Sequence, residues 1–558
     1  MDGSEETLNI ALQLLHSFSQ YSGLNVNFEK THVVWIGALK YSTQSIKARW
    51  KLVWGCTQFK LLGLTFDVDL PKMIEQNYND KLVKLENIIA HWNRRELTPL
   101  GRITVVKTLI LPMFIHLFVS LPQPREAICK VLNDKVLKFV WQGPSKIKAK
   151  VITKDFDEGG LKMVDINAFI KSLKLSWIRK VIQGQNKFTS LAKKLIDFNI
   201  LCNTGSLYAI SAVKNITNAF WIDVLTIYSD FVKSINIDSV DKLVDMPLFF
   251  NNCLLINNKY IFWKYWYDDG IRFVKDIIKD SGQILSLQEL QAKMNKPVNF
   301  LHYEGIKKVL STYIVSVQNV KLKDYKVHSY PILSTYIKPI ILNSCNKLLY
   351  NMLKENSEIP TCQTKWNEYF ADDSIQWKNV HGQVFKKTNN TYIQWLQTRI
   401  IHRILGTNSH LFKMGLSDSK TCTFCKMSEE TITHLFWDCN TVKILIKDIS
   451  DSLKNAKIQI VINSKMFLLG DTNVNDSCFI LFMEVKKYIF ECKRKEVIPN
   501  FQGLKASLKL SLNIYANTTN ESNKGIFWKV IVCKRRLELF PFEGGRVIFG
   551  QSKKINKT

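Results

Sequence analysis

Apolar positions recur at helical spacing along much of the chain. At the N-terminus this pattern predicts a helix that Ser4 caps and Gly23 ends. Its apolar face comprises Leu8, Ala11, Leu12, Leu15 and Phe18. Beyond Gly23, apolar and polar residues alternate over Leu24–Phe28, which is typical of a half-buried strand. Further strands are predicted over Val33–Ile36 and Phe59–Phe66.

Longer helical patterns follow these strands. Helices are predicted over Ile74–Trp92, Ile103–Val119, Ile128–Trp141 and Ile166–Ile182. Pro112 is expected to interrupt the second of them. The sequence therefore predicts a mainly α fold with a small α+β remnant at the N-terminus, since so few strands cannot form an independent sheet.

The chain has 558 residues, which is too many for one hydrophobic core. Changes of pattern suggest five segments: an α+β remnant, a basic helical domain, a connector of mixed short helices without a repeat, a cysteine–histidine region and a basic helical tail. Their limits are 1–70, 71–182, 183–389, 390–445 and 446–558. The most apolar run, Thr108–Leu121, is shorter than the roughly 20 residues of a membrane span and contains Pro112 and His116. We expect a buried helix there and no membrane partner.

Positive charge is in large excess. The chain has 77 Lys and Arg against 48 Asp and Glu, a net charge of +29, which favours a nucleic acid as partner. Arg399 and Arg403 are four residues apart on a predicted helix, Trp395–Gly406, and would share a face. The candidate phosphate contacts of the helical module are Lys135, Lys138, Lys146, Lys148 and Lys150.

Other basic residues extend this charge. They are Lys154, Lys171, Lys174, Arg179 and Lys180, and in the tail Lys486, Lys487, Lys493–Lys495 and Lys534–Arg536. Aromatic residues are interleaved with the lysines, as in surfaces that follow a phosphate backbone. The alternative is that the aromatic side chains, among them Phe139 and Trp141, belong to the core and the lysines form a solvated face.

Cysteine and histidine form one compact motif. Cys422, Cys425, His434 and Cys439 have the spacing C-x2-C-x8-H-x4-C. Three thiolates and one imidazole suit a structural zinc ion, because closed four-ligand sites of this kind leave no position for a substrate. The alternative is a set of ordinary reduced cysteines beside a core histidine. The cysteine content, twelve in all, and the polar start of the sequence favour a reducing, intracellular compartment.

Tyr369–Asp373 contains an aspartate pair that superficially resembles a polymerase metal site. Polymerases place such a pair in a hairpin between apolar strands, where it binds two magnesium ions. The flanking residues here, Trp366–Glu368 and Ser374–Trp377, are not an apolar strand pair. We therefore interpret this stretch as a solvated acidic turn.

Taken together and in order, five stretches resemble the reverse transcriptases of LINE-type (non-LTR) retrotransposons. They are Gly23–Thr31, Phe59–Gly63, Leu97–Arg102, Gly159–Leu161 and the Cys422–Cys439 cluster. The resemblance covers residues 1–182 and about 390–445 well and the remainder loosely.

The resemblance implies a role for each part. Residues 1–70 would be the end of the palm, 71–182 the thumb and 390–445 the zinc-binding C-terminal segment. Lys30 matches the lysine that acts as general acid toward the departing pyrophosphate. The residues that match the primer grip are Phe59, Leu61, Leu62 and Gly63. The implied parent activity is RNA-directed DNA polymerisation, with an RNA–DNA template and primer as partner, in the cytoplasm and nucleus.

The family's catalytic aspartate hairpin would lie just before Met1, and Asp2–Glu5 resembles the linker that follows it. The chain is therefore expected to be a C-terminal fragment without ligands for the Mg²⁺ of the intact enzyme. Lys30 alone is not sufficient for catalysis, because metal ions position and stabilise the transferring phosphoryl group. We expect the chain alone to bind nucleic acid without polymerising it. The alternative function is a zinc-stabilised protein-interaction module with no nucleic-acid role.

Overall fold

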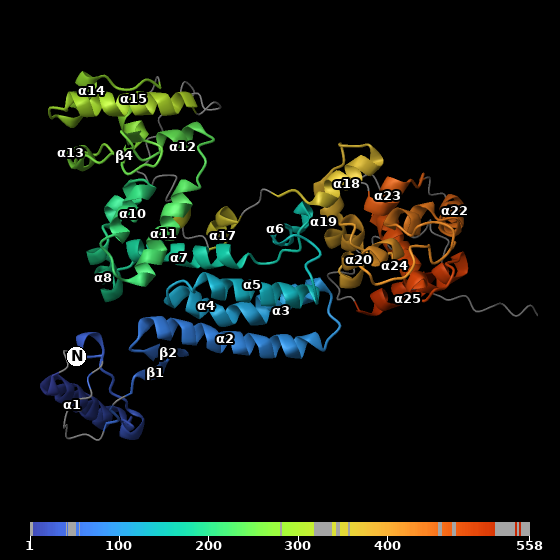
Figure 1. The fold of residues 1–558 in the computed structure, drawn as a ribbon, viewed down its shortest axis with the longest axis horizontal. Coiled ribbons are helices and arrows are strands. Elements are labelled where there is room, and N and C mark those ends of the chain that lie inside the picture. The colour runs from blue at the N-terminus through green and yellow to red at the C-terminus, as the bar shows by residue number, and fades with distance from the viewer. Residues whose placement is uncertain are drawn as a thin grey trace, which may run out of the picture. The chain divides into compact units, whose positions relative to one another are not determined.

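The structure is a computed structural model that confirms the mainly helical fold class (Figure 1). It describes residues 4–40, 42, 52–54, 56–279, 282–316, 338–341, 346–354, 358–455, 460–470, 476–518, 542–543 and 546–547. Asp2, Gly3 and the predicted basic stretch Lys534–Arg536 lie outside the described residues.

The chain forms two compact units that alternate along the sequence. Unit 1 comprises Met1–Trp92, Thr108–Lys135 and Asp165–Lys354, and unit 2 comprises Asn93–Lys107, Val136–Val164 and Glu355–Thr558. Each unit is therefore assembled from distant parts of the sequence.

The helices and strands of the first half, numbered in chain order with 3-10 and π-helices as η, are α1 (Glu5–Ser22), η1 (Phe28–Lys30), η2 (Gly37–Leu39), β1 (Gln58–Leu61), β2 (Leu64–Asp67), α2 (Leu70–Asn93), α3 (Pro99–Val105), η3 (Val106–Ile110), α4 (Leu111–Ser120), α5 (Glu126–Trp141), α6 (Ala149–Ile152), η4 (Phe156–Glu158), α7 (Ile166–Gln183), α8 (Lys187–Leu195), α9 (Phe198–Asn203), α10 (Ser206–Val213), α11 (Ala219–Lys233), α12 (Val240–Val244), β3 (Leu255–Ile256), β4 (Lys259–Tyr260) and α13 (Lys264–Asp268).

Those of the second half are η5 (Val274–Ile277), α14 (Leu287–Met294), α15 (Phe300–Ser316), α16 (Lys338–Ile341), α17 (Lys347–Leu353), α18 (Thr361–Phe370), α19 (Trp377–Lys387), α20 (Thr391–Ile401), α21 (Asn408–Lys413), η7 (His434–Asp438), α22 (Asn440–Asn455), α23 (Ser464–Leu469), α24 (Asp476–Arg494), α25 (Phe501–Thr518), β5 (Phe542–Glu543) and β6 (Arg546–Val547). Each pair β1–β2, β3–β4 and β5–β6 is an antiparallel two-stranded hairpin.

The N-terminal strand predictions are only partly correct. Helix α1 starts after Ser4 and ends at Gly23, as predicted. The strands predicted over Leu24–Phe28 and Val33–Ile36 are wrong, because the chain forms a 3-10 turn at η1 and a single bridge at His32 instead. The side chain of Asn27 accepts a hydrogen bond from the backbone N–H of Lys30, a local bond that competes with strand pairing.

The segment Phe59–Phe66, predicted as one strand, is a hairpin. Leu62 and Gly63 both have positive φ, 51° and 82°, which is the backbone twist that tight hairpins favour. Phe59 stacks on Phe66 across the two strands, with ring centroids 5.1 Å apart. The glycine therefore marks a turn and not a close backbone approach within one strand.

The apolar helix is longer than the run Thr108–Leu121. Continuous helical structure covers Pro99–Ser120, and this is the described helix that is long and apolar enough to span a membrane. Its middle widens into the π-helix η3 just before Pro112, which cannot donate a backbone hydrogen bond. Val106, Ile110 and Phe114 of this helix are fully buried.

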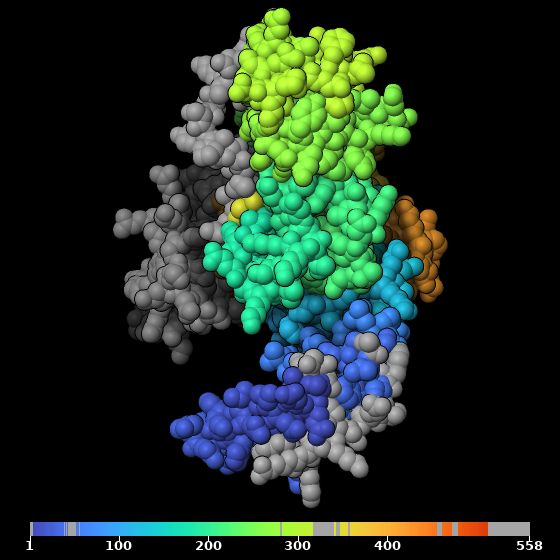
Figure 2. All heavy atoms as spheres, turned by 90° about the vertical axis from the view of Figure 1, so that its left-hand side faces the viewer, coloured from blue at the N-terminus to red at the C-terminus, as the bar shows by residue number. Residues whose placement is uncertain are grey.

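The core of unit 1 lies in the part that sequence patterns described least well. One hydrophobic cluster extends from Leu175 to Leu349 and includes the fully buried Trp266. Helices α7, α10 and α11 supply much of it. The described residues from α8 to α15 form a continuous body in Figure 2, coloured from blue-green to yellow-green. Residues 183–279 and 282–316 of the predicted connector thus supply helices to this core.

The core of unit 2 surrounds the cysteine–histidine region. A second cluster joins α18, α20, α22 and α24, and Cys422 and Cys439 belong to it. Helix α20 packs against α3, α19, α23 and α24. The predicted helix Trp395–Gly406 is too long: α20 ends at Ile401, and Arg403 has a positive φ of 57°.

Candidate metal centre

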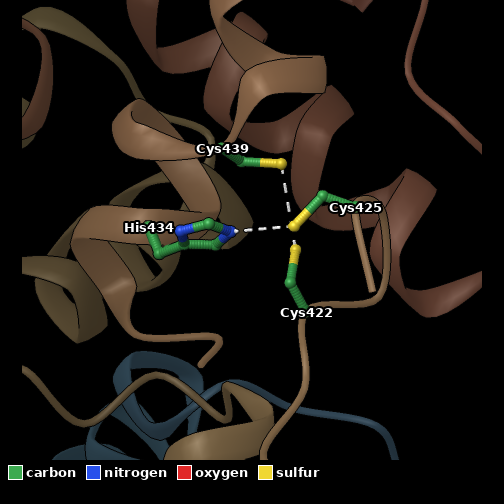
Figure 3. Close-up of side chains that lie close together, drawn as sticks. All are labelled: Cys422, Cys425, His434 and Cys439. Atoms are coloured by element: carbon green, nitrogen blue, oxygen red, sulfur yellow. Dashed lines mark hydrogen bonds between the residues drawn. The ribbon is translucent and has the colours of Figure 1, made fainter. Parts of the chain in front are cut away.

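Four side chains converge in unit 2 (Figure 3). The sulfur atoms of Cys422, Cys425 and Cys439 and a ring nitrogen of His434 all lie within 4.8 Å of one another. Cys422 and Cys439 are completely buried, while Cys425 and His434 are half-buried. The predicted ligand set is therefore brought together in space.

Local backbone structure explains how each ligand is positioned. The first two cysteines lie on a tight turn in which Lys426 N–H donates to the Cys422 carbonyl over 3.0 Å and Lys426 adopts φ 57°. His434 begins the π-helix η7 and Cys439 follows its end. The Cys439 N–H donates to the His434 carbonyl over 3.0 Å, so these two ligands are one wide helical turn apart.

The donor distances fit a tetrahedral zinc ion. Zinc–sulfur bonds of about 2.3 Å place tetrahedral sulfur ligands about 3.8 Å apart. Cys422 Sγ and Cys439 Sγ are 3.9 Å apart, and Cys425 Sγ is 3.4 Å from His434 Nε2. Three thiolates and one imidazole would hold zinc in a closed structural site with no position for a substrate.

Backbone N–H groups near the buried sulfur atoms favour the deprotonated thiolates, which are the form that binds a metal cation. The hydrogen bond from the Cys422 thiol, together with the N–H groups of Val442 and Thr441 at the start of α22, outweighs burial and lowers the pKa of Cys439 to about 4. Cys422 itself has a raised pKa because of Cys439 and burial, partly offset by the N–H groups of Cys425 and Phe424. Zinc needs deprotonated thiolates, and these donors are placed to stabilise them.

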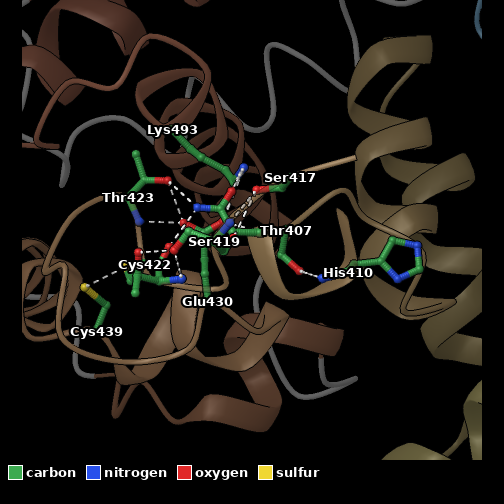
Figure 4. A network of polar contacts seen from close by, with 11 residues as sticks. Thr407, His410, Ser417, Ser419, Cys422, Thr423, Glu430, Cys439 and Lys493 are labelled. Carbon is green, nitrogen blue, oxygen red and sulfur yellow. Dashed lines mark hydrogen bonds and ion pairs between the residues drawn. The ribbon is translucent and has the colours of Figure 1, made fainter. Parts of the chain in front are cut away.

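A buried carboxylate, which sequence reasoning missed, holds the cysteine turn (Figure 4). Glu430 is fully buried and accepts hydrogen bonds from Thr423 N–H and Oγ1, at 2.8 and 2.7 Å. It also accepts from the backbone N–H of Asn408 over 2.9 Å. Because Thr423 lies between the first two cysteines, Glu430 fixes the turn from behind. A glutamate near zinc ligands gives no distinctive spacing in the sequence.

Lys493 completes this network from α24. Its Nζ lies 3.2 Å from Glu430 Oε1 and 3.1 Å from Asn408 Oδ1. The Lys493 side chain is 10% exposed, so the charge of the buried carboxylate is neutralised inside the protein. The tail residue that we predicted to extend the positive surface is thus a structural partner of the metal region.

The predicted motif Gly159–Leu161 also packs in unit 2. Gly159 follows η4 with φ 84°, and a Cβ there would lie 3.0 Å from both His381 and Pro360. Helix α19, which carries His381, packs against η4. Glycine is needed for both the left-handed backbone and the close approach.

The two predicted arginine contacts with nucleic acid do not share a helix face. Arg399 is largely enclosed between Trp395 and Phe490, with centroid distances of 5.7 and 5.1 Å, and burial lowers its pKa. Arg403 lies beyond the end of α20 and donates to the Lys365 carbonyl over 3.2 Å. The helix ends early because Arg403 takes a left-handed backbone, so the four-residue spacing no longer aligns the side chains.

The predicted lysine contacts divide into two groups. Lys135 and Lys148 already pair with carboxylates: Lys135 lies 2.5 Å from Glu86, and Lys148 lies 3.3 Å from Glu358. The side chains of the other three residues, Lys138, Lys146 and Lys150, are exposed. Partial enclosure and Arg399 nearby lower the pKa of Lys146.

Two lysines that we counted toward the basic surface lie inside the core. Lys174 is fully buried, donates to the Leu121 carbonyl, and has its pKa lowered to about 7 by burial. Lys486 is also buried and donates to Gln397 Oε1 over 2.6 Å. Both lie on helices, where apolar spacing alone does not reveal a buried amine. The aromatic alternative was correct for Phe139 and Trp141, which are buried.

Four of the five candidate site residues assigned to the palm are exposed. Lys30 ends η1 at the surface, and the tip of the β1–β2 hairpin exposes Leu61 and Leu62 by 53% and 85%. Phe59 is half-buried, and Gly63 forms the turn. The roles of these residues in catalysis and primer binding stay predictions.

The aspartate pair Asp372–Asp373 lies at a helix end and not in a strand hairpin. Helix α18 stops at Phe370, and Ala371 has a positive φ of 49°. Asp372 lies 2.5 Å from Lys465, and this hydrogen bond with those from Ser374 lowers the pKa of Asp372. The geometry agrees with the predicted acidic turn.

A known protein family matches the region that contains the four ligands. Residues 349–445 match a family described as zinc-binding in reverse transcriptase. The matched range contains all four converging ligands and Glu430, and it begins upstream of the predicted limit at residue 390. The Cys422–Cys439 geometry and this match together identify residues 349–445 as a zinc-binding region related to those of reverse transcriptases.

Proposed function

We propose that the chain is part of a non-LTR retrotransposon reverse transcriptase and binds RNA and RNA–DNA duplex. The observation that carries the proposal is the closed ligand cluster within the region related to reverse transcriptases. The net charge of +29 supports a polyanionic partner. Structural zinc would fix the fold of the region that presents the basic residues, and it would take no part in chemistry.

Exposed lysines supply the proposed contacts. Lys138, Lys146 and Lys150 are exposed in unit 2, and Lys135 and Lys148 lie beside the carboxylates of Glu86 and Glu358. Phosphate contacts release counterions, so the logarithm of the binding constant falls by about 0.9 per contact for each tenfold rise in salt. A steep salt dependence is therefore the signature of the proposed function.

The test is filter binding of the zinc-loaded full chain to an RNA–DNA duplex over a salt series. We expect a steep negative slope, and a triple Lys→Glu variant at Lys138, Lys146 and Lys150 should reduce both affinity and slope. The control is a triple Lys→Glu variant at exposed residues of unit 1, Lys187, Lys194 and Lys233, which changes the net charge equally. A flat salt dependence, or equal losses in both variants, would contradict the proposal.

We further propose that this chain alone does not polymerise. Lys30 would have to act without the paired metal-binding aspartates of the family. Primer extension on poly(rA)/oligo(dT) with magnesium should give no product above background, and robust synthesis would overturn this part of the proposal.

A further inference from the structure

Arg399 in unit 2 is a partly enclosed cation without a hydrogen-bond acceptor. Its guanidinium carbon lies 5.7 Å from the ring centroid of Trp395 and 5.1 Å from that of Phe490. Its Nε is buried and donates to no acceptor among the described residues, and Arg399 forms no ion pair with them. The rings attract the positive charge but do not replace an acceptor. An anion from outside the chain would therefore stabilise this guanidinium.

A second cation, Arg494, approaches the same guanidinium from α24. Arg494 is exposed and lies four residues after Phe490, so both side chains are on the helix face that packs against α20. Burial lowers the pKa of Arg399, and the charge of Arg494 adds to this effect. The preceding residue, Lys493, pairs with Glu430, whereas Arg494 pairs with no carboxylate in the described part of the chain.

A third cation, Lys146, comes from the segment that follows α5. Trp141 ends α5 and contacts Trp395 of α20, with ring centroids 6.0 Å apart, so the two segments lie side by side. Partial enclosure lowers the pKa of Lys146, and the charge of Arg399 adds to this effect. Lys146 is exposed and forms no ion pair with any described residue. Three cations from separate segments therefore lie together without a paired carboxylate.

The chemistry of this cluster favours a phosphate group. Glu491, the nearest carboxylate along α24, lies three residues before Arg494 and pairs with none of the three cations. A guanidinium presents its N–H donors in one plane, which matches two oxygen atoms of a phosphate. The contacts with Trp395 and Phe490 restrict the orientation of that plane. A bound phosphate would also offset the repulsion between the cations.

We propose that Arg399, Arg494 and Lys146 bind one backbone phosphate of a nucleic-acid strand. Arg399 would donate hydrogen bonds to its oxygen atoms from an oriented guanidinium, and the two exposed cations would neutralise its charge. Because the three cations lie together, they would share one phosphate instead of contacting three. The inference rests on the proposed function and assigns one of its contacts to a defined site.

The test measures fluorescence anisotropy of a labelled RNA–DNA duplex with the zinc-loaded full chain over a salt series. Arg399→Met and Arg494→Gln should each weaken binding about tenfold, the loss of a hydrogen bond to a charged group. The double variant should reduce the salt slope by about 0.9, which is one phosphate contact, and not by about 1.8. The control Lys447→Gln removes an exposed lysine of α22 in the same unit and should leave the slope unchanged.

Melting temperature without nucleic acid shows whether the arginine is already compensated. Arg399→Met should melt no lower than wild type, because it replaces an enclosed charge without an acceptor by an apolar side chain. A lower melting temperature would show that the two rings suffice for the cation and would count against the site. Arg494→Gln changes an exposed residue and keeps the binding test valid in that case.

The outcomes separate this site from the proposed function. Wild-type binding without steep salt dependence would sink the proposed function itself. Steep wild-type binding with a double variant that behaves like Lys447→Gln would overturn the site alone. A slope loss near 1.8 would show two separate phosphates, and equal competition by polyglutamate would indicate an acidic protein partner, so either result would also overturn the site.

Discussion

At the scale of single residues, the metal region depends on side chains that are not ligands. Glu430 accepts three hydrogen bonds from the segments around the cysteine turn and pairs with Lys493, all inside the protein. The four ligands were predictable, because thiol and imidazole spacing reflects metal geometry directly. Glu430 and Lys493 were not, because a glutamate or lysine is common on any surface and only its burial shows its role.

Replacement of Glu430 should therefore weaken zinc binding. Glu430→Gln keeps the shape but loses the charge that pairs with Lys493, and we expect a zinc affinity about 10–100-fold lower. Competition with a chromophoric chelator measures this. The control is Glu429→Gln, an exposed neighbour that accepts from Ser409 Oγ. Unchanged affinity in Glu430→Gln would contradict the assigned role.

A buried histidine, His381, and a half-buried one, His402, are expected to make the stability of unit 2 sensitive to acid. Burial lowers the pKa of His381 to about 3, with His402 adding to the effect, and burial lowers that of His402 to about 4. Their ring centroids are 5.6 Å apart, and His381 Nε2 lies 3.2 Å from Gln363 Nε2. Both histidines are therefore neutral in the folded protein at neutral pH.

The sign of the pH dependence follows from these values. Unfolded histidine binds a proton near pH 6.5 and the folded residues do not, so stability is complete above pH 6.5 and declines as pH falls toward 3. His381→Asn should flatten this decline in melting temperature between pH 6.5 and 4, measured with excess zinc. The control is His116→Asn, at an exposed site. Identical slopes in His381→Asn and wild type would show that His381 does not contribute.

At the scale of elements, the helices agree with the sequence better than the strands do. Helices α2, α5 and α7 match their predicted ranges within a few residues because their apolar spacing is regular. The strand predictions for residues 24–36 are wrong because the side chain of Asn27 accepts a hydrogen bond from a backbone N–H three residues later, which a strand would have used for pairing. Helix α20 ends early because a left-handed residue, Arg403, follows it. The alternation and spacing of apolar residues reveal neither the side-chain hydrogen bond of Asn27 nor the left-handed backbone of Arg403.

The turn at Gly159 gives a test at this scale. Gly159→Ala should destabilise unit 2 by about 1–3 kcal/mol, because the new Cβ meets both a left-handed backbone and the side chains of His381 and Pro360. Gly415→Ala is the control in the same unit, since its φ is also positive, 67°, but a Cβ there meets open space. Denaturant titration should show a larger loss for Gly159→Ala.

At the scale of the whole molecule, the two units alternate along the chain, so neither can be recognised from a contiguous stretch of sequence. The basic composition was evident from the sequence. The distribution of that charge was not, because Lys174 and Lys486 are buried and other lysines are paired. Long-range contacts decide which cations reach the surface.

Removal of zinc should affect the units unequally. All four ligands lie in unit 2, while the large cluster from Leu175 to Leu349 lies in unit 1. With a strong chelator, we expect faster amide hydrogen exchange at residues 420–445 and no change over residues 219–233 of α11. Exchange that accelerates equally in both stretches would show that zinc stabilises the whole chain.

The π-helix between the last two ligands restricts how many residues can separate them. His434 and Cys439 are five residues apart, and only the wide turn of η7 brings positions so spaced onto one side of a helix. In an ordinary α-helix, residues four apart share a face. Loss of one residue between the two ligands could therefore be absorbed by relaxation to an α-turn, whereas gain of one could not. We therefore expect the four-ligand site to tolerate a one-residue deletion in this short stretch and not a one-residue insertion.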